Sequence, residues 1–368
     1  MKIESSLKQV STLVKGESSL DQRFFIKNLS SLESAGPEDV AVILERGSAS
    51  SFNEVDRKKI EKSKAGVILS RNEVVPGKPY ILVDDPLHAL VQLTQFAKQK
   101  QGGDVRGDVS PHAVIHEQAY LGKGVTVEAY AVVEKGARVG DYAVIGAGSV
   151  IQAHATVGDS TRIYPRVTLL RDCHVGAHTI VHSGAVIGSD GFGYQVTQEG
   201  LRKVPHVGSV HIGNHVEIGA GCCIDRATFD ATIISDGCKL DNMVHVAHNV
   251  TIGASTAILA HTSIGGGAKI GSGCQIGGQV AIKDGVTIGD GAKIVSKSAV
   301  TKDIAQKAVV CGQPAQDFRA WKREYSALKS VTNHVLSQRQ KTKTVPALAQ
   351  MVVRVWKRLM DFVRFPRT

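Results

Sequence analysis

Aromatic residues make up only 5% of this 368-residue chain, and it contains no recognisable nucleic-acid-binding module. Proteins that bind single-stranded nucleic acid stack the bases on aromatic side chains, so we expect no nucleic acid partner. No apolar run approaches the length needed to cross a bilayer. Residues 1–20 are polar and lack the apolar core of a signal peptide, which favours a cytoplasmic location.

Cysteine is scarce as well, and none of the six cysteines forms a Cys-x-x-Cys pair. Several fall where the repeat described below requires a small residue, which predicts reduced packing residues rather than disulfides or a zinc site. A phosphate-binding P-loop and a Gly-x-Ser-x-Gly elbow in a strand-to-helix context are also missing. Positive charge is in excess: 44 basic and 34 acidic residues give a net charge of +10. This charge favours an acidic partner such as a carrier protein, a nucleotide or an anionic membrane surface.

An aliphatic residue returns at every sixth position between residues 113 and 304, often followed by glycine or another small residue. A helix needs a period near 3.6 and a strand a period of 2. A period of six is the hexapeptide signature of a parallel β-helix, in which three hexapeptides make one triangular coil of about eighteen residues. The aliphatic side chains then stack along the axis as a continuous core. These register positions run from Ile115 to Ile187, from Ile212 to Ile224 and from Ile234 to Val300.

Two segments interrupt the period. The register slips by one between residues 189 and 210, where glycine, tyrosine and charged residues predict a loop thrown out from one corner. In the second, around residues 226–232, ten residues separate successive register positions. Insertions in a solenoid often sit on its binding face, but a neutral insertion has the same appearance in a sequence.

The chain on either side of the repeat has a different character. Apolar runs at 40–44, 66–69 and 80–83 predict short strands, and residues 52–64 and 86–100 predict helices. We therefore expect a small α/β domain over residues 1–103. The linker Gly102-Gly103-Asp104 joins it to the β-helix domain of residues 104–312.

Residues 313–368 form the expected C-terminal helical extension, which begins with a helix over 314–336. Residues 345–367 place apolar side chains on one helical face and arginine and lysine beside them. A basic amphipathic helix of this kind lies on an anionic membrane surface, or it packs against its symmetry mates at the end of an oligomer. Both interpretations stay open.

The candidate chemistry lies in residues 240–250. Val246 holds a register position and points inward, so His248, two residues further on, projects outward from the coil wall. An exposed and oriented imidazole is suited to act as a general base. Gly266 follows one coil later and should lie beside His248, where its backbone N–H suits an oxyanion donor. Asp241 is near enough to accept the other imidazole N–H, and the three residues together fit acyl transfer.

A zinc site is the rival interpretation, as in the β-helical carbonic anhydrases. The spacings of three of the candidate histidines, 245, 248 and 261, are not multiples of a coil, which argues against three imidazoles meeting at one metal ion. The candidate ligands are His211, His215, His245, His248 and His261.

Several motifs resemble those of the UDP-3-O-acylglucosamine N-acyltransferases of lipid A biosynthesis, over roughly residues 20–325. They are Gly36-Pro37-Glu38-Asp39, Ile187-Gly188-Ser189-Asp190-Gly191-Phe192-Gly193-Tyr194, Ile224-Asp225-Arg226, Asp241-Asn242 with Ala247-His248-Asn249-Val250, Gly277-Gly278-Gln279-Val280 and Gly312-Gln313-Pro314-Ala315. The resemblance implies a homotrimer of left-handed β-helices with an N-terminal uridine-binding domain and a C-terminal helical extension. It also implies active sites between neighbouring subunits.

Carried over residue by residue, the resemblance implies that His248 is the catalytic base, Asp241 its acidic support and Gly266 the oxyanion donor. The implied reaction moves a 3-hydroxyacyl chain from acyl carrier protein, the co-substrate, to the 2-amino group of UDP-3-O-acylglucosamine. It requires no cofactor and no metal. An acidic carrier protein agrees with the positive net charge.

Substrate contacts are expected from Asn242, His245 and Asn249, which flank the catalytic residues, and from Asn53 and Phe52 in the first domain. Asn53 matches the asparagine of the family's uracil-binding motif. Phe52 either stacks on the uracil from a shifted position or is buried.

Two motifs depart from the family pattern. Asp56 stands where the uracil-binding motif has a tyrosine, and the segment 283–286 lacks the second histidine that family members carry after Gly-Gly-Gln-Val. Three hypotheses follow: the N-acyltransferase itself, a paralogue acting on a different nucleotide amino sugar, and a non-catalytic trimer that binds carrier protein. The basic tail adds the expectation of peripheral contact with the inner membrane.

Overall fold

The computed structural model describes residues 1–368 except 21–23, 45–53, 73–76, 101–106 and 340–368. The chain divides into two compact units, Met1–Val105 and Arg106–Thr368, each of which is described by itself. The predicted linker Gly102-Gly103-Asp104, the predicted uracil contacts Phe52 and Asn53, and the amphipathic tail lie outside the described residues.

The first unit is a six-stranded sheet of order β1-β3-β4-β5-β6-β2 with helices on both faces. Its four central strands are parallel, and the edge strands β1 and β2 are antiparallel to their neighbours. The strands are β1 (Lys2–Ser6), β2 (Glu17–Ser18), β3 (Phe25–Ser30), β4 (Asp39–Val42), β5 (Val67–Ser70) and β6 (Tyr80–Leu82), and the helices are α1 (Leu7–Val14), α2 (Glu54–Lys62) and α3 (Pro86–Lys100).

Alternation along the central strands explains the two covered faces. Val67 and Leu69 of β5 pack against α1 and α3, whereas Ile68 between them packs with Ile60 of α2. A strand points successive side chains to opposite faces, so an unbroken apolar run predicts a sheet buried on both sides. The predicted strands β4, β5 and β6 and helices α2 and α3 are confirmed. The sequence patterns do not reveal β1, α1 or β3.

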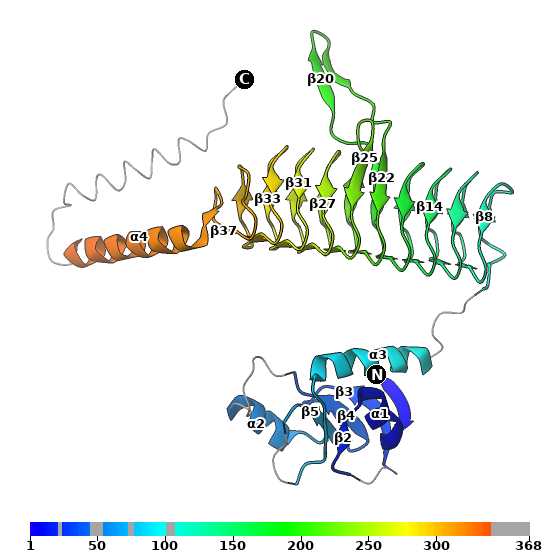
Figure 1. The fold of residues 1–368 in the computed structure, drawn as a ribbon, viewed down its shortest axis with the longest axis vertical. Helices are drawn as coiled ribbons and strands as arrows, with labels where there is room; N and C mark the ends of the chain where they lie inside the picture. The colour runs from blue at the N-terminus through cyan, green and yellow to red at the C-terminus, as the bar shows by residue number, and fades with distance from the viewer. Residues whose placement is uncertain (21–23, 45–53, 73–76, 101–106, 340–368) are drawn as a thin grey trace. The chain divides into compact units, whose positions relative to one another are not determined.

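The second unit is a parallel β-solenoid with three walls (Figure 1). The first wall contains β7 (Val114–Ile115), β10 (Val132–Val133), β13 (Val150–Ile151), β16 (Thr168–Leu169), β19 (Val186–Ser189), β24 (Cys223–Asp225), β27 (His245–Val246), β30 (Ser263–Ile264), β33 (Ala281–Ile282) and β36 (Ala299–Val300). The second contains β8 (Tyr120–Leu121), β11 (Arg138–Val139), β14 (Thr156–Val157), β17 (His174–Val175), β22 (Ser209–Ile212), β25 (Ala231–Ile234), β28 (Thr251–Ile252), β31 (Lys269–Ile270) and β34 (Thr287–Ile288). The third contains β9 (Thr126–Val127), β12 (Val144–Ile145), β15 (Arg162–Ile163), β18 (Ile180–Val181), β23 (Glu217–Ile218), β26 (Lys239–Leu240), β29 (Ala257–Ile258), β32 (Gln275–Ile276), β35 (Lys293–Ile294), β37 (Val309–Cys311) and the antiparallel β38 (Gln316–Asp317).

The core of the solenoid is the predicted one. Every register position from Val127 to Val300 is buried, as is a smaller residue two positions before most of them. Only Ile115 and Leu121, in the first coil, are partly buried, because no complete coil precedes them. The predicted parallel β-helix is therefore confirmed, and its left-handed winding stays a prediction.

Cysteines occupy the smaller inward position of the solenoid, as expected from their places in the repeat. Cys173, Cys222, Cys238 and Cys274 are buried with free thiols. Cys223 is the exception among the solenoid cysteines, because it points outward from β24 and is exposed.

The first interruption of the period is a hairpin, β20 (Tyr194–Thr197) paired antiparallel with β21 (Gly200–Lys203), which projects from the solenoid (Figure 1). Its base is tied to the wall by Arg226, a buried residue of the second interruption. The Arg226 guanidinium donates to the carbonyl oxygens of Gly188, Gly208 and Arg171. The two interruptions thus form one structure.

The C-terminal extension begins with α4 (Phe318–Arg339), four residues later than predicted, because β38 pairs with β37 before the helix starts. Within the described ranges, no helix combines the length and apolar character that a membrane span requires.

Candidate functional site

His248 and Gly266 lie in equivalent turns, one coil apart, at the corner between the first and second walls. His248 follows β27 and is half-buried, and Gly266 follows β30, the next strand of the same wall. The Gly267 N–H donates to the His248 carbonyl oxygen at 2.8 Å. A Cβ placed on Gly266 would lie 2.8 Å from both Cε1 and Nε2 of His248. The proximity that the coil length predicts is confirmed.

The hydrogen bonds of His248 fix which ring nitrogen carries the proton. Its Nδ1 lies 2.9 Å from Oδ1 of Asn249. That oxygen also accepts from the Thr228 backbone N–H at 3.2 Å, so it is an acceptor and Nδ1 must be the donor. The Nε2 lone pair is left free on the side of the ring that faces Gly266. This is the tautomer that a general base needs.

Asn249 is itself held in place. It adopts a φ of 61°, and its N–H donates to Thr232 Oγ1 at 3.0 Å. Asparagine tolerates this left-handed conformation better than most residues. Its side chain is thereby directed back to His248 and to Thr228 of the second interruption, so that insertion helps to orient the imidazole.

Asp241 does not contact His248 within one chain, and the expectation that it orients the ring in this way is wrong. Asp241 follows β26, at the corner before β27, whereas His248 lies at the corner after β27. Its carboxylate accepts from the Asn242 N–H at 2.7 Å and from the Ala260 N–H at 3.1 Å. Seven residues carry the chain along one full side of the triangle, so the two residues lie at opposite ends of a wall. Asn249 accepts the imidazole proton instead.

The structure places Asn242 with Asp241 rather than with His248. The Asn242 Oδ1 accepts from the Ala220 N–H at 2.8 Å. Both residues line a cavity of about 400 Å³, together with His182 and Glu217, which are joined by a hydrogen bond of 2.9 Å. Two corners of the solenoid therefore carry candidate polar groups, one with His248 and one with Asp241.

The Gly266 N–H, the predicted oxyanion donor, already has a partner. It donates to Oδ1 of Asp284 at 2.9 Å, one coil further along. The same contact joins the Lys123 N–H to Asp141 and the Ser272 N–H to Asp290, each at 2.8 Å. The contact is thus a recurring structural device of this solenoid. An oxyanion can reach the Gly266 N–H only by displacing the Asp284 carboxylate.

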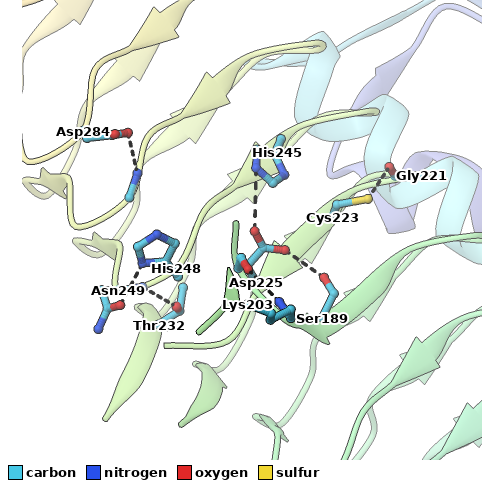
Figure 2. Close-up of polar contacts among 12 residues, drawn as sticks. Ser189, Lys203, Gly221, Cys223, Asp225, Thr232, His245, His248, Asn249 and Asp284 are labelled. Carbon is cyan, nitrogen blue, oxygen red and sulfur yellow. Dashed lines mark hydrogen bonds and ion pairs between the residues drawn. The ribbon is translucent and has the colours of Figure 1, made fainter. Parts of the chain in front are cut away.

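The buried carboxylate of Asp225 and the imidazoles of His245 and His206 lie near His248. Figure 2 shows Asp225, His245 and His248. Asp225 is only 7% exposed, accepts from Ser189 Oγ at 2.8 Å and lies 3.8 Å from Nε2 of His245. Burial raises the pKa of Asp225, although the Ser189 hydroxyl and the nearby imidazoles favour its charged form. The His206 ring packs edge-on against His248, with centroids 5.1 Å apart.

The histidines proposed as zinc ligands do not converge. His211 packs against His174 with centroids 4.6 Å apart, and His215 stacks on His178 at 5.0 Å. Across the described portion of the chain, no group of three histidine, cysteine, aspartate or glutamate residues could hold a metal ion.

Comparison with known proteins places the chain in a family. Residues 112–153, 154–189 and 267–302 match the family model for bacterial transferase hexapeptide (six repeats). The chain is 36% identical over 319 residues to UDP-3-O-acylglucosamine N-acyltransferase of Bordetella pertussis, covering 83% of this chain and 86% of that protein. The chain belongs to this N-acyltransferase family. The corresponding protein of Desulfotalea psychrophila is also 36% identical, over 332 residues, covering 88% of this chain and 92% of that protein.

A solved structure shares the fold of this N-acyltransferase family member. It is the UDP-N-acetylglucosamine acyltransferase of Arabidopsis, which is 21% identical and has a TM-score of 0.52. The match covers 57% of this chain and 73% of that one. The family resemblance carried by the motifs is confirmed.

The predicted site omits three contributors to the His248 corner, of which the first two nevertheless leave a signal in the sequence: the orienting role of Asn249, the cap by Asp284, and His206. The coil length that predicts Gly266 also predicts Asp284, which stands one further coil along. Asn249 is signalled by its position directly after the histidine, in a turn that requires a left-handed residue. His206 lies in the aperiodic segment that follows β21, where the repeat gives no signal.

Proposed function

We propose that this protein transfers a 3-hydroxyacyl chain from acyl carrier protein to the 2-amino group of UDP-3-O-acylglucosamine, a step of lipid A biosynthesis. Family membership supports the reaction class. The observation that carries the mechanism is the hydrogen bond between Nδ1 of His248 and Asn249, which leaves Nε2 as the acceptor at an outward corner against Gly266.

The mechanism follows from that tautomer. The amine attacks the thioester carbonyl, and Nε2 of His248 takes a proton from the attacking nitrogen as the C–N bond forms. The imidazolium then protonates the departing sulfur as the C–S bond breaks. Asn249 keeps the ring in place through both steps, and the Gly266 N–H stabilises the oxyanion once Asp284 has given up that bond. General base catalysis of this kind contributes roughly 10²–10⁴-fold.

A homotrimer would reunite the two polar corners. Asp241 and His248 flank the same wall, so they cannot meet within one chain. Threefold packing of solenoids brings the corner of one subunit to the next corner of its neighbour, which would set Asp241 beside the His248 of another subunit. Because Asn249 already accepts the Nδ1 proton, the Asp241 carboxylate would support His248 there by stabilising the imidazolium through its charge.

The uridine-binding role of the first unit, with Asn53 and Phe52, belongs to the same proposal, as does the location in the cytoplasm with peripheral contact at the inner membrane. Liposome binding tests the membrane contact. The full chain should bind anionic liposomes, and a chain without residues 345–368 should not. Equal binding by both chains contradicts the contact.

A non-catalytic trimer that binds carrier protein is the second candidate. The occupied N–H of Gly266 favours it, because Asp284 stands where the oxyanion must bind. The paralogue acting on another nucleotide amino sugar is the third candidate, favoured by Asp56 in place of the tyrosine in the uracil-binding motif.

One assay separates the three candidates. The full chain is incubated with 3-hydroxyacyl carrier protein and UDP-3-O-acylglucosamine, and the diacylated product is detected by mass. Product formation supports the proposal. Turnover only with another nucleotide amino sugar selects the paralogue. Carrier protein binding without turnover on any amino sugar selects the scaffold.

A further inference from the structure

Among the described residues, His206 carries a buried ring nitrogen without a hydrogen-bond partner. The side chain is only 6% exposed. Its Nδ1 lies 3.2 Å from the Val204 carbonyl oxygen, so Nδ1 carries the proton. Nε2 is therefore a hydrogen-bond acceptor, and it has no partner. Burying an acceptor unpaired destabilises a fold, so such an atom calls for a functional explanation.

The unpaired nitrogen lies beside the proposed base. The rings of His206 and His248 pack edge-on at 5.1 Å. Gly191 covers both of them: a Cβ on Gly191 would lie 2.7 Å from Nε2 of His206 and 2.7 Å from Cδ2 of His248. Cδ2 is the ring neighbour of the His248 Nε2. The Gly191 backbone thus packs against Nε2 of His206 and against the Cβ–Cδ2 edge of His248, and a ligand bound at Nε2 of His248 reaches Nε2 of His206 only if Gly191 moves.

The corner offers several hydrogen-bond acceptors to a ligand. The two Nε2 lone pairs accept, and the nearby Asp225 carboxylate, itself buried, also accepts. A neutral amine has two N–H donors and one lone pair, so it can donate to both imidazoles and still direct its lone pair at a carbonyl carbon. A hydroxyl has one donor and leaves one imidazole unpaired.

We infer that His206 is a specificity-determining residue that selects an amino group over a hydroxyl as the acyl acceptor. This inference rests on the proposed function. Gly191 withdraws as the substrate binds, and the amine donates one N–H to His248 and the other to His206. The first N–H breaks, and its proton passes through His248 to the sulfur as the C–S bond is replaced by C–N. The second N–H stays in the product amide, bonded to His206.

The matched test replaces His206 by phenylalanine, which keeps an aromatic ring at this position and removes the Nε2 acceptor together with the Nδ1–H donor to Val204. The ratio of kcat/KM for UDP-3-O-acylglucosamine to kcat/KM for its 2-hydroxyl analogue is measured for wild type and His206→Phe. One hydrogen bond corresponds to about a tenfold change. We expect the preference for the amine to fall about tenfold. His211→Phe, an exposed histidine of β22 that packs against His174, should leave the ratio unchanged.

Thermal unfolding distinguishes loss of recognition from loss of structure. His206→Phe removes the unpaired Nε2 but also the Nδ1–H bond to the Val204 carbonyl oxygen, so its unfolding temperature should stay close to that of the wild type. If it does unfold earlier, the ¹⁵N resonance of His206 Nε2 in the wild type decides: it should shift when the amine substrate binds and stay in place with the hydroxyl analogue.

The inference is overturned if a stably folded His206→Phe keeps the wild-type preference for the amine over the hydroxyl analogue, or if the Nε2 resonance does not shift when the amine substrate binds. Either result leaves the proposed function intact. A wild type that neither binds nor acylates the amine substrate contradicts the proposed function, and the inference falls with it.

Discussion

Replacing Gly266 by alanine tests the geometry of the His248 corner. The backbone of Gly266 is not in the left-handed region, so alanine fits its conformation without strain. The added Cβ would lie 2.8 Å from Cε1 and Nε2 of His248. Carbon contacts are favourable at about 3.5–4.0 Å, so the ring must retreat by about 0.7 Å or more. The displaced atom is the proposed base itself, and a misplacement of about 1 Å costs roughly 10²-fold in rate.

Gly267 provides the matched control. Its φ is +66°, and a Cβ there would meet nothing within 4 Å. Alanine at this position is strained by about 1–2 kcal/mol but does not touch His248. We therefore expect opposite results. Gly266→Ala should lose about 100-fold in kcat and little stability, whereas Gly267→Ala should lose stability and keep its activity.

Two measurements check this pair. Release of free thiol from the acyl carrier protein gives kcat, and thermal unfolding gives the stability of each variant. Gly266→Ala with wild-type kcat, or Gly267→Ala with an equally large loss of kcat, refutes the placement of the base against Gly266.

Asp284→Ala should raise kcat, because it frees the Gly266 N–H, and should lower the unfolding free energy by about 1 kcal/mol. The control is Asp290→Ala, which removes the equivalent cap on the Ser272 N–H at the next corner and should lower stability without changing kcat. A kcat that does not rise in Asp284→Ala argues against Gly266 as oxyanion donor. Burial raises the pKa of Asp225 in the folded state above that of an ordinary carboxyl group. The stability that its protonated form contributes is therefore present below the ordinary carboxyl pKa, and it is lost as the pH rises through the pKa of the folded state. Asp225→Asn should therefore unfold at a higher temperature than wild type at pH 7, with a gain that vanishes at acidic pH; a pH-independent difference contradicts this assignment. Alkylation at pH 8 should modify the exposed Cys223 well before Cys222, because burial raises the pKa of the Cys222 thiol to about 11. Mass spectrometry of peptides measures the two modification rates. Equal rates for Cys223 and Cys222 would contradict this expectation and show that the solenoid opens locally.

The repeat makes much of the solenoid predictable because one rule governs every coil. An aliphatic residue at each sixth position must point inward, so the buried positions and the walls follow from counting. The same counting brings Gly266 to His248, since both occupy one corner of successive coils. The rule also gives Asp284 above Gly266, where the repeat stacks a carboxylate on a backbone N–H.

Other contacts do not follow from the period. Asp241 precedes His248 by only seven residues, but one side of the triangle separates them, so a short sequence distance does not imply contact across a corner. Asn249 orients the ring through its own φ of 61° and through Thr228, which belongs to an insertion. His206 comes from beyond the projecting hairpin, and only the folded base of that hairpin brings it to His248. Contacts made by aperiodic segments depend on tertiary structure.

The most direct test of the central claim is the kcat of His248→Ala in the transfer of an acyl chain from carrier protein to UDP-3-O-acylglucosamine. If Nε2 of His248 is the base, kcat should fall by about 100-fold or more, while KM for the nucleotide sugar and the unfolding midpoint stay near those of the wild type. A variant that keeps about a tenth or more of the wild-type kcat would contradict the assignment.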